Sequence, residues 1–208
     1  NNWEATCFDF TEEKLLEIAR TAKETGVELF VLDDGWFGER SNEHAGLGDW
    51  FANTKRLPQG ITGLSKKIGE IGMKFGLWFE PEMVNKDSDL YRQHPDWIIA
   101  APERRQSHGR FQYVLDFSRT EVVDYIYSMM ETLLSDADIS YIKWDMNRSI
   151  TECFSNTLPA DRQGEVYHRY ILGVYELYER LIGRFPQILF ESCASGGGRF
   201  DPAPGVDK

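Results

Sequence analysis

The chain has 208 residues, of which 41% are hydrophobic and 27% are charged, and this composition is typical of one globular domain with a sizeable core. Its 23 basic and 34 acidic residues give a net charge of −11, and no basic cluster appears, so we expect neither nucleic acid nor an anionic membrane as a partner. No run of about 18 uncharged apolar residues occurs, and we therefore expect no transmembrane helix.

The cysteines and histidines give no sign of a metal site. Cys7, Cys153 and Cys193 are odd in number, widely separated and without a CxxC pair, and the four histidines show no HExxH-like spacing. Such a set predicts neither a disulfide framework nor a zinc site. It favours a reducing compartment, and we expect a cytoplasmic protein.

Strands are predicted to alternate with helices along the whole chain. The predicted strands cover residues 5–10, 27–32, 75–79, 113–117, 139–144 and 188–190. Predicted helices follow Thr11, which is a suitable N-cap, run through Leu64 to Ile71, follow the Ser118–Glu121 capping-box pair, and cover the apolar repeat from Val166 to Leu181. The loop from 35 to about 60 is unusually long, and loops of that length are commonly functional.

Alternating strands and helices favour a parallel sheet, for which two architectures compete. A doubly wound sheet usually carries a glycine-rich turn after its first strand, but residues 9–12 contain no glycine. Acidic and polar residues instead follow nearly every strand, as at the active-site mouth of a (β/α)8 barrel. Since a full barrel takes about 250 residues, we predict one catalytic (β/α)8 TIM-barrel domain over 1–208, truncated after about six βα units.

The ends of the predicted strands carry the candidate chemistry. These residues are Asp33, Asp34, Trp78, Glu80, Glu82, Asp116, Lys143, Asp145, Asn147, Glu191 and Cys193. Lys143, Asp145 and Asn147 share one face of their strand, because side chains two residues apart align. A neighbouring lysine can keep Asp145 ionised at neutral pH, as the nucleophile of a retaining glycosidase must be. The Asp33–Asp34 pair can accept hydrogen bonds from several sugar hydroxyls.

Each of these residues also has a purely structural interpretation. An aspartate after a strand is commonly a helix N-cap or a turn residue, although no helix is predicted directly after Asp145. Trp3 and Trp78 also suit an apolar core, and Cys193 suits a small buried position. The glycine run from Gly196 lacks the Lys-Ser/Thr of a phosphate-binding loop and better fits close approach of the backbone to a ligand.

Six ordered motifs together resemble glycoside hydrolase family 36, the bacterial α-galactosidases or melibiases. The motifs are Trp3-Glu4-Ala5 with Phe8-Asp9-Phe10, Leu32-Asp33-Asp34-Gly35-Trp36-Phe37-Gly38, Gly76-Leu77-Trp78-Phe79-Glu80-Pro81-Glu82-Met83, Tyr113-Val114-Leu115-Asp116, Lys143-Trp144-Asp145-Met146-Asn147-Arg148, and Glu191-Ser192-Cys193 with Gly196-Gly197-Gly198-Arg199-Phe200-Asp201. The resemblance covers about residues 1–202, and the fixed order of the motifs makes it highly specific.

The resemblance implies a (β/α)8 catalytic domain that releases terminal α-linked galactose with retention, as from melibiose or raffinose, without a metal or organic cofactor. It implies that Asp145 is the nucleophile, that Asp33 and Asp34 bind the galactose 4- and 6-hydroxyls, and that Trp3 and Trp78 are aromatic contacts. The further sugar contacts that it implies are Arg110, Lys143, Asn147, Cys193 and Gly196.

The sequence departs from the family pattern in one respect. The family's acid/base, an aspartate in a Trp-x-Ser-Asp type motif on the following strand, has no counterpart here, whereas retaining chemistry needs two carboxyl groups about 5–5.5 Å apart. We therefore expect this chain alone to be inactive or nearly so. Its unpaired strand edges predict association, and we expect the full-length parent to be a homo-oligomer. A non-catalytic galactose-binding fragment and a transglycosylase that passes galactose to another sugar stay open as alternatives.

Overall fold

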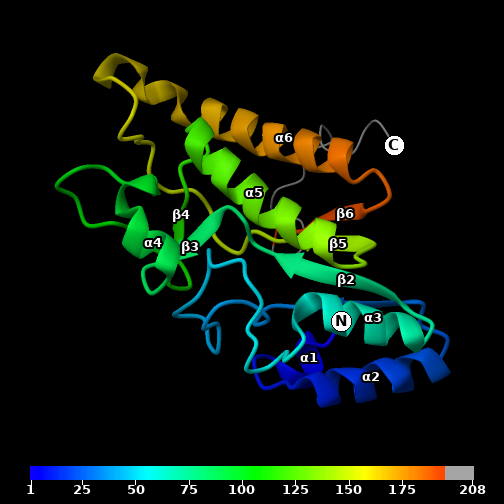
Figure 1. Cartoon of the computed structure of the whole chain (residues 1–208). Helices are drawn as coiled ribbons and strands as arrows, with labels where there is room; N and C mark the ends of the chain where they lie inside the picture. The colour runs from blue at the N-terminus through cyan, green and yellow to red at the C-terminus, as the bar shows by residue number, and fades with distance from the viewer. Residues whose placement is uncertain (195–208) are drawn as a thin grey trace.

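A computed structural model describes residues 1–194 of the chain (Figure 1). Its elements, in order, are α1 (Trp3–Thr6), α2 (Glu12–Glu24), β1 (Leu29–Leu32), α3 (Gly60–Glu70), β2 (Lys74–Phe79), β3 (Met83–Asn85), α4 (Asp89–Gln93), the 3-10 helix η1 (Pro95–Trp97), β4 (Gln112–Val114), α5 (Thr120–Asp136), β5 (Tyr141–Trp144), the 3-10 helix η2 (Ala160–Glu165), α6 (Val166–Arg184) and β6 (Leu189–Ser192).

A parallel sheet of four strands, in the order β1-β2-β5-β6, forms the centre of the structure. The register pairs Leu32 with Leu77, Trp78 with Lys143, and Trp144 with Ser192. Helices α2 and α3 lie side by side near β1 and β2, while α5 and α6 pack against each other beside β5 and β6 (Figure 1). Because all four strands run in the same direction, their carboxyl ends meet at one edge of the sheet.

Helix α2 shows how the sequence directs these elements. The Thr11 hydroxyl accepts a hydrogen bond from the backbone N–H of Lys14, as the N-cap prediction requires. Leu15 and Ala19 are fully buried on one face of the helix, and Gly26 follows the helix with a φ of +90°. The predicted parallel α/β sheet and this predicted helix are both confirmed.

Two of the six predicted strands are wrong as members of the parallel sheet. Residues 5–10 contain no strand, because the Asn2 carbonyl accepts the N–H groups of Ala5 and Thr6 and so begins the short helix α1. The predicted strand 113–117 appears as β4, which pairs antiparallel with β3 in a separate two-stranded sheet. The parallel sheet of the described residues therefore has four strands instead of six.

The predicted capping box before α5 is also wrong. The N-cap residue of α5 is Arg119, and its side chain makes no cap hydrogen bond. The Ser118 hydroxyl instead donates to the carboxylate of Asp116 in the turn after β4. This local hydrogen bond takes the place of the predicted cap bond.

Buried aromatic side chains order the long loop that connects β1 to α3. Trp36 and Trp50 are at most 1% exposed, and the indole N–H of Trp36 donates to the carbonyl of Trp78 at 2.9 Å. The Phe37 and Trp50 rings lie 4.5 Å apart, between centroids. This packing fixes the loop against the end of β2, so the residues that begin it, Asp33 and Asp34, have defined positions.

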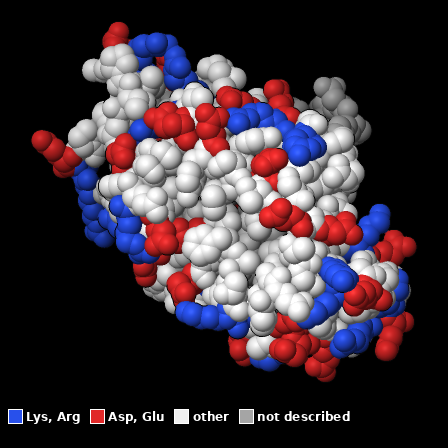
Figure 2. All heavy atoms as spheres, viewed as in Figure 1, with Lys and Arg blue, Asp and Glu red and all other residues white. Residues whose placement is uncertain are grey.

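The surface of the described residues carries charges of both signs. Acidic and basic side chains are interspersed over the face seen in Figure 2. Within residues 1–194, none of the helices has the length and apolar character that crossing a bilayer requires.

Candidate active site

Several of the predicted site residues meet at the carboxyl edge of the parallel sheet. The backbone N–H of Asp145 donates to the Phe79 carbonyl at 2.8 Å, and that of Cys193 donates to the Trp144 carbonyl at 2.7 Å. These bonds continue the ladder one step beyond the strands. They bring the residues that follow β2, β5 and β6 together.

The Asp145 carboxylate is 7% exposed and is held by several donors. The side-chain amide of Asn147 donates to Oδ2 at 2.8 Å, the backbone N–H of Met146 donates to Oδ1 at 2.9 Å, and the Trp78 indole N–H lies 3.3 Å from Oδ2. Burial raises the pKa of Asp145, but hydrogen bonds from Asn147, Cys193, Met146 and Trp78 outweigh it and leave the pKa below its ordinary value. Asp145 is therefore ionised at neutral pH.

The ammonium group of Lys143 binds Asp33. Its Nζ lies 2.8 Å from Asp33 Oδ2, and both side chains are largely buried. Burial lowers the pKa of Lys143, but its hydrogen bond to Asp33 outweighs burial and holds the pKa above its ordinary value. The backbone of Asp33 is fixed from α1, because the side-chain carbonyl of the fully buried Asn2 accepts its N–H at 2.9 Å.

A buried arginine neutralises Asp34. Arg40 Nε and Nη2 donate to the two carboxylate oxygens of Asp34 at 2.9 and 2.7 Å, and the arginine is 2% exposed. This bidentate geometry fixes the carboxylate plane and leaves the remaining lone pairs of its oxygens to accept other hydrogen bonds. The sequence prediction did not include Arg40, which lies within the irregular loop.

Asn85 links this ion pair to the loop that carries Arg110. Its Oδ1 accepts hydrogen bonds from Arg40 at 3.0 Å and from the Leu47 backbone at 2.9 Å. Its Nδ2 donates to the carbonyls of Phe111 at 2.9 Å and Glu43 at 3.2 Å. All four hydrogen-bonding positions of this fully buried amide are used.

Arg110 is not joined to this cluster by a side-chain bond in the part of the chain described. Its side chain is exposed, its φ is +52°, and no hydrogen bond or ion pair joins it to another side chain in the part of the chain described. Trp3 lies in α1, next to Asn2, partly exposed and with its ring edge-to-face with Phe8 at a centroid distance of 5.2 Å. Cys193 is partly exposed beyond β6, and Gly196 lies outside the described residues.

Two glutamates after β2 lie directly behind the cluster. Glu80 is 0% exposed, and its carboxylate oxygens accept the backbone N–H of Asn147 and, at 2.9 Å, the side-chain amide of Gln112. Burial, reinforced by the negative charge of Asp145, raises the pKa of Glu80 to about 8, although the bond from Asn147 opposes this shift. Glu82, also 0% exposed, accepts the Trp144 indole N–H at 2.9 Å.

The sequence marked both glutamates as strand-end acids, but it assigned neither a function. The partners of Glu80 come from β4 and from the segment after β5, and those of Glu82 come from β5 and α6, so only the fold shows what the two glutamates hold.

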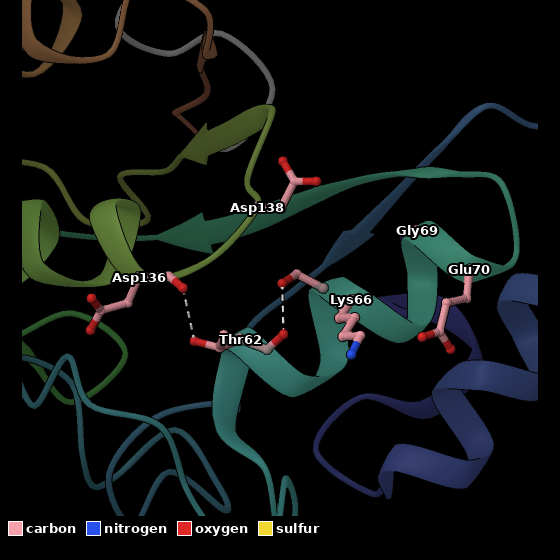
Figure 3. Close-up of a pocket in the computed structure, with 7 residues that line it drawn as sticks. Thr62, Lys66, Gly69, Glu70, Asp136 and Asp138 are labelled. Atoms are coloured by element: carbon pink, nitrogen blue, oxygen red, sulfur yellow. Dashed lines mark hydrogen bonds between the residues drawn. The ribbon is translucent and has the colours of Figure 1, made fainter.

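Neither a candidate metal-binding cluster nor the surface hollow of Figure 3 contributes residues to this site. Among residues 1–194, no group of three or more His, Cys, Asp and Glu side chains is arranged to hold a metal ion. The hollow lies between α3 and the end of α5 with the residues that follow it, where the Thr62 hydroxyl donates to the Asp136 carbonyl at 3.2 Å (Figure 3). It contains none of the predicted site residues.

Comparisons with known proteins identify the family. The melibiase family model matches residues 1–206. The chain is 57% identical over 202 residues to the α-galactosidase AgaA of Geobacillus stearothermophilus. Its structure superimposes with a TM-score of 0.95 on the α-galactosidase of Lactobacillus brevis, at 59% identity and covering 97% of this chain and 27% of that one. The TM-score is also 0.95 for an AgaA variant in complex with raffinose, at 56% identity, covering 99% of this chain and 28% of that one.

The match to AgaA covers 97% of this chain but only 28% of that enzyme, so the chain spans little more than a quarter of its relative's length. The resemblance that the six motifs carry is confirmed over nearly the whole chain, and the chain belongs to the melibiase family.

Proposed function

We propose that the chain forms the nucleophile-bearing part of an α-galactosidase, which hydrolyses terminal α-linked galactose with retention of configuration. The observation that carries this proposal is the state of Asp145, a largely buried carboxylate that several hydrogen bonds keep ionised at the carboxyl edge of a parallel sheet. An ionised carboxylate in a shielded site is the nucleophile that such a reaction needs.

In the proposed reaction, an Asp145 oxygen attacks the anomeric carbon of galactose and forms a covalent glycosyl ester. As the glycosidic bond breaks, an acid protonates the departing oxygen, and the same group then removes a proton from the water that hydrolyses the ester. The Trp-x-Ser-Asp type motif of the family's acid/base is not found in this sequence. We therefore expect the 208 residues alone to turn over substrate very slowly or not at all.

The two carboxylates after β1 are proposed to bind the sugar hydroxyls. Asp33 and Asp34 are at most 7% exposed, Lys143 binds Asp33 and Arg40 binds Asp34, and the carboxylate oxygens can accept hydrogen bonds from sugar hydroxyls. Burial outweighs the bond from Arg40 and raises the pKa of Asp34 above its ordinary value. The faces of Trp3 and Trp78 would contact the apolar C–H surface of galactose, with Asn147, Cys193, Arg110 and Gly196 as further contacts. A raffinose complex of an AgaA variant supports α-galactosyl oligosaccharides as the substrate class.

The proposed fold of the whole domain is a (β/α)8 barrel. Four parallel strands with helices between them are a consecutive part of such a barrel, and in the described residues β1 and β6 each have a strand neighbour on one side only. We also propose a cytoplasmic homo-oligomer. Fractionation of cells and sedimentation of the intact protein test these two points.

The decisive experiment replaces Asp145 with asparagine in the intact protein. Asp145→Asn should abolish turnover of an aryl α-galactoside while galactose binding, measured by calorimetry, persists. The matched control is Asp9→Asn, whose side chain is 91% exposed, and it should behave as wild type. Wild-type turnover by Asp145→Asn would overturn the proposal, and a protein that binds galactose without any turnover would favour the non-catalytic alternative.

The reaction product distinguishes the transglycosylase alternative from the proposed hydrolase. With a second sugar in excess, an enzyme of that kind forms a galactosylated acceptor, whereas the proposed hydrolase releases mainly free galactose. Both products are measurable by chromatography.

A further inference from the structure

Asn147 bonds two carboxyl groups at the same time. Its side-chain amide donates to Asp145 Oδ2 at 2.8 Å, while its backbone N–H donates to Glu80 Oε1. Glu80 therefore fixes the backbone of Asn147, and this backbone places the Asn147 side-chain amide against Asp145. Glu80 itself is held from β4, through the side-chain amide of Gln112.

No cation balances Glu80. Among the described residues it forms no ion pair, and the two cations of the site, Lys143 and Arg40, are bound to Asp33 and Asp34. The charged groups that act on Glu80 are Asp145, after β5, and Asp34, after β1, and both are negative. An unpaired carboxylate at 0% exposure is strongly disfavoured, so this position favours the neutral acid.

Gln112 offers an acceptor for the proton of a neutral Glu80. Its Oε1 is buried and has no hydrogen-bond partner within the described part of the chain. Rotation of the amide about its last bond exchanges Oε1 with the Nε2 that now contacts Glu80 Oε2. The Glu80 hydroxyl can then donate to Gln112, while its carbonyl oxygen still accepts the Asn147 N–H.

We propose that Glu80 is a positioning residue that works as a neutral acid. Glu80 holds the backbone of Asn147, so that the side-chain amide of Asn147 stays hydrogen-bonded to Asp145. Because Glu80 keeps its proton, Asp145 is the only anion among Glu80, Asn147 and Asp145. This inference rests on the proposed function of Asp145 as nucleophile. Burial, which raises the pKa of Glu80 to about 8, agrees with it.

Infrared difference spectroscopy tests the protonation of Glu80 without reference to activity. The difference between the wild-type intact protein and its Glu80→Gln variant at neutral pH should contain the C=O stretch of a protonated carboxylic acid. The control is Glu39→Gln, at a side chain that is 77% exposed, and its difference should contain carboxylate bands only. Carboxylate bands alone in the Glu80→Gln difference would overturn the inference.

The pH dependence of thermal unfolding gives a second measurement. The pKa of Glu80 is about 8 in the folded state against an ordinary value of 4.5, so the folded state keeps a proton that the unfolded state loses. The stability of wild type relative to Glu80→Gln should therefore fall between about pH 4.5 and pH 8 and be level on either side. Parallel stability curves for the two proteins would contradict a neutral Glu80.

Turnover separates positioning from a merely structural role. Glu80→Ala removes the acceptor of the Asn147 N–H, and kcat should fall by about tenfold or more, as for a lost buried hydrogen bond. Glu80→Gln restores the acceptor without the charge and should recover most of that loss. No recovery would overturn the inference. If the wild-type protein has no α-galactosidase activity, the proposed function fails, while the infrared and unfolding measurements still decide the state of Glu80.

Discussion

The ammonium group of Lys143, in β5, lies 2.8 Å from the carboxylate of Asp33, which follows β1. It does not bind Asp145, which directly follows β5. The low pKa of Asp145 comes mainly from hydrogen bonds of uncharged donors, and Lys143 is engaged elsewhere. The lysine therefore serves as the ion-pair partner of the buried Asp33 carboxylate.

Removing this cation should destabilise the protein. In Lys143→Met, Asp33 stays buried without its partner, and the free energy of unfolding should fall by about 3 kcal/mol, as for one broken buried ion pair. Denaturant unfolding measures the change. Lys55→Met is the control, because Lys55 and its partner Glu39 are both 77% exposed, and its effect should be far smaller. Equal effects would show that Asp33 does not need the lysine.

The hydrogen bonds to Asp145 predict a pH effect. Asn147→Ala removes the 2.8 Å bond to Oδ2, so the pKa of Asp145 should rise and the acid limb of kcat/KM should move to higher pH. The pKa of this group is lowered in the folded state, so the stability that it contributes is present at neutral pH and is lost as the pH falls through its folded pKa. The variant should lose part of that contribution.

A pH–rate profile of the intact protein checks this. Asn156→Ala is the control, because its amide reaches only the Asp96 carbonyl at the surface, and its acid limb should coincide with that of wild type. An unmoved acid limb in Asn147→Ala would mean that Asn147 does not help to ionise Asp145.

The sequence predicted the acids of this site well, because side chains that follow parallel strands meet at one edge. Asp33, Trp78 and Asp145 lie there as expected. The sequence did not predict Arg40 or Asn85 as residues of the site, because both lie in irregular or short segments. Each also binds residues far from it in the sequence, up to 45 positions away for the bond between Arg40 and Asn85. No periodic pattern marks a residue whose function is to join two loops.

The wrong strand at 5–10 has a similar cause. Its short apolar pattern fits a strand, but the carbonyl of Asn2 accepts the N–H groups of Ala5 and Thr6 and begins a helix there instead. The side-chain oxygen of Asn2 also binds the N–H of Asp33, 31 residues away. A local pattern cannot report a bond of that range, so tertiary context decided the outcome.

Asn85 should control the loop that carries Arg110. Asn85→Asp keeps the acceptor of Arg40 but cannot donate to the carbonyls of Phe111 and Glu43, which lie against it. Hydrogen exchange around residues 105–111 should speed up, and KM for an aryl α-galactoside should rise more than kcat falls. Asn156→Asp is the matched surface control. Unchanged exchange would show that the loop does not depend on Asn85.

Gly46 should be required for the position of Arg40, and so of Asp34. Its φ is +83°, and a Cβ there would lie 2.8 Å from the backbone N of Arg40, closer than such contacts allow. Gly46→Ala should cost about 1–3 kcal/mol of stability and weaken galactose binding, because the Arg40 backbone must move. Gly69→Ala is the matched control in α3, where a Cβ meets nothing within 4 Å and a helical alanine should stabilise slightly. Thermal melts and calorimetry on both variants make the comparison, and a Gly46→Ala protein as stable and as tightly binding as Gly69→Ala would show that Asp34 does not depend on this turn.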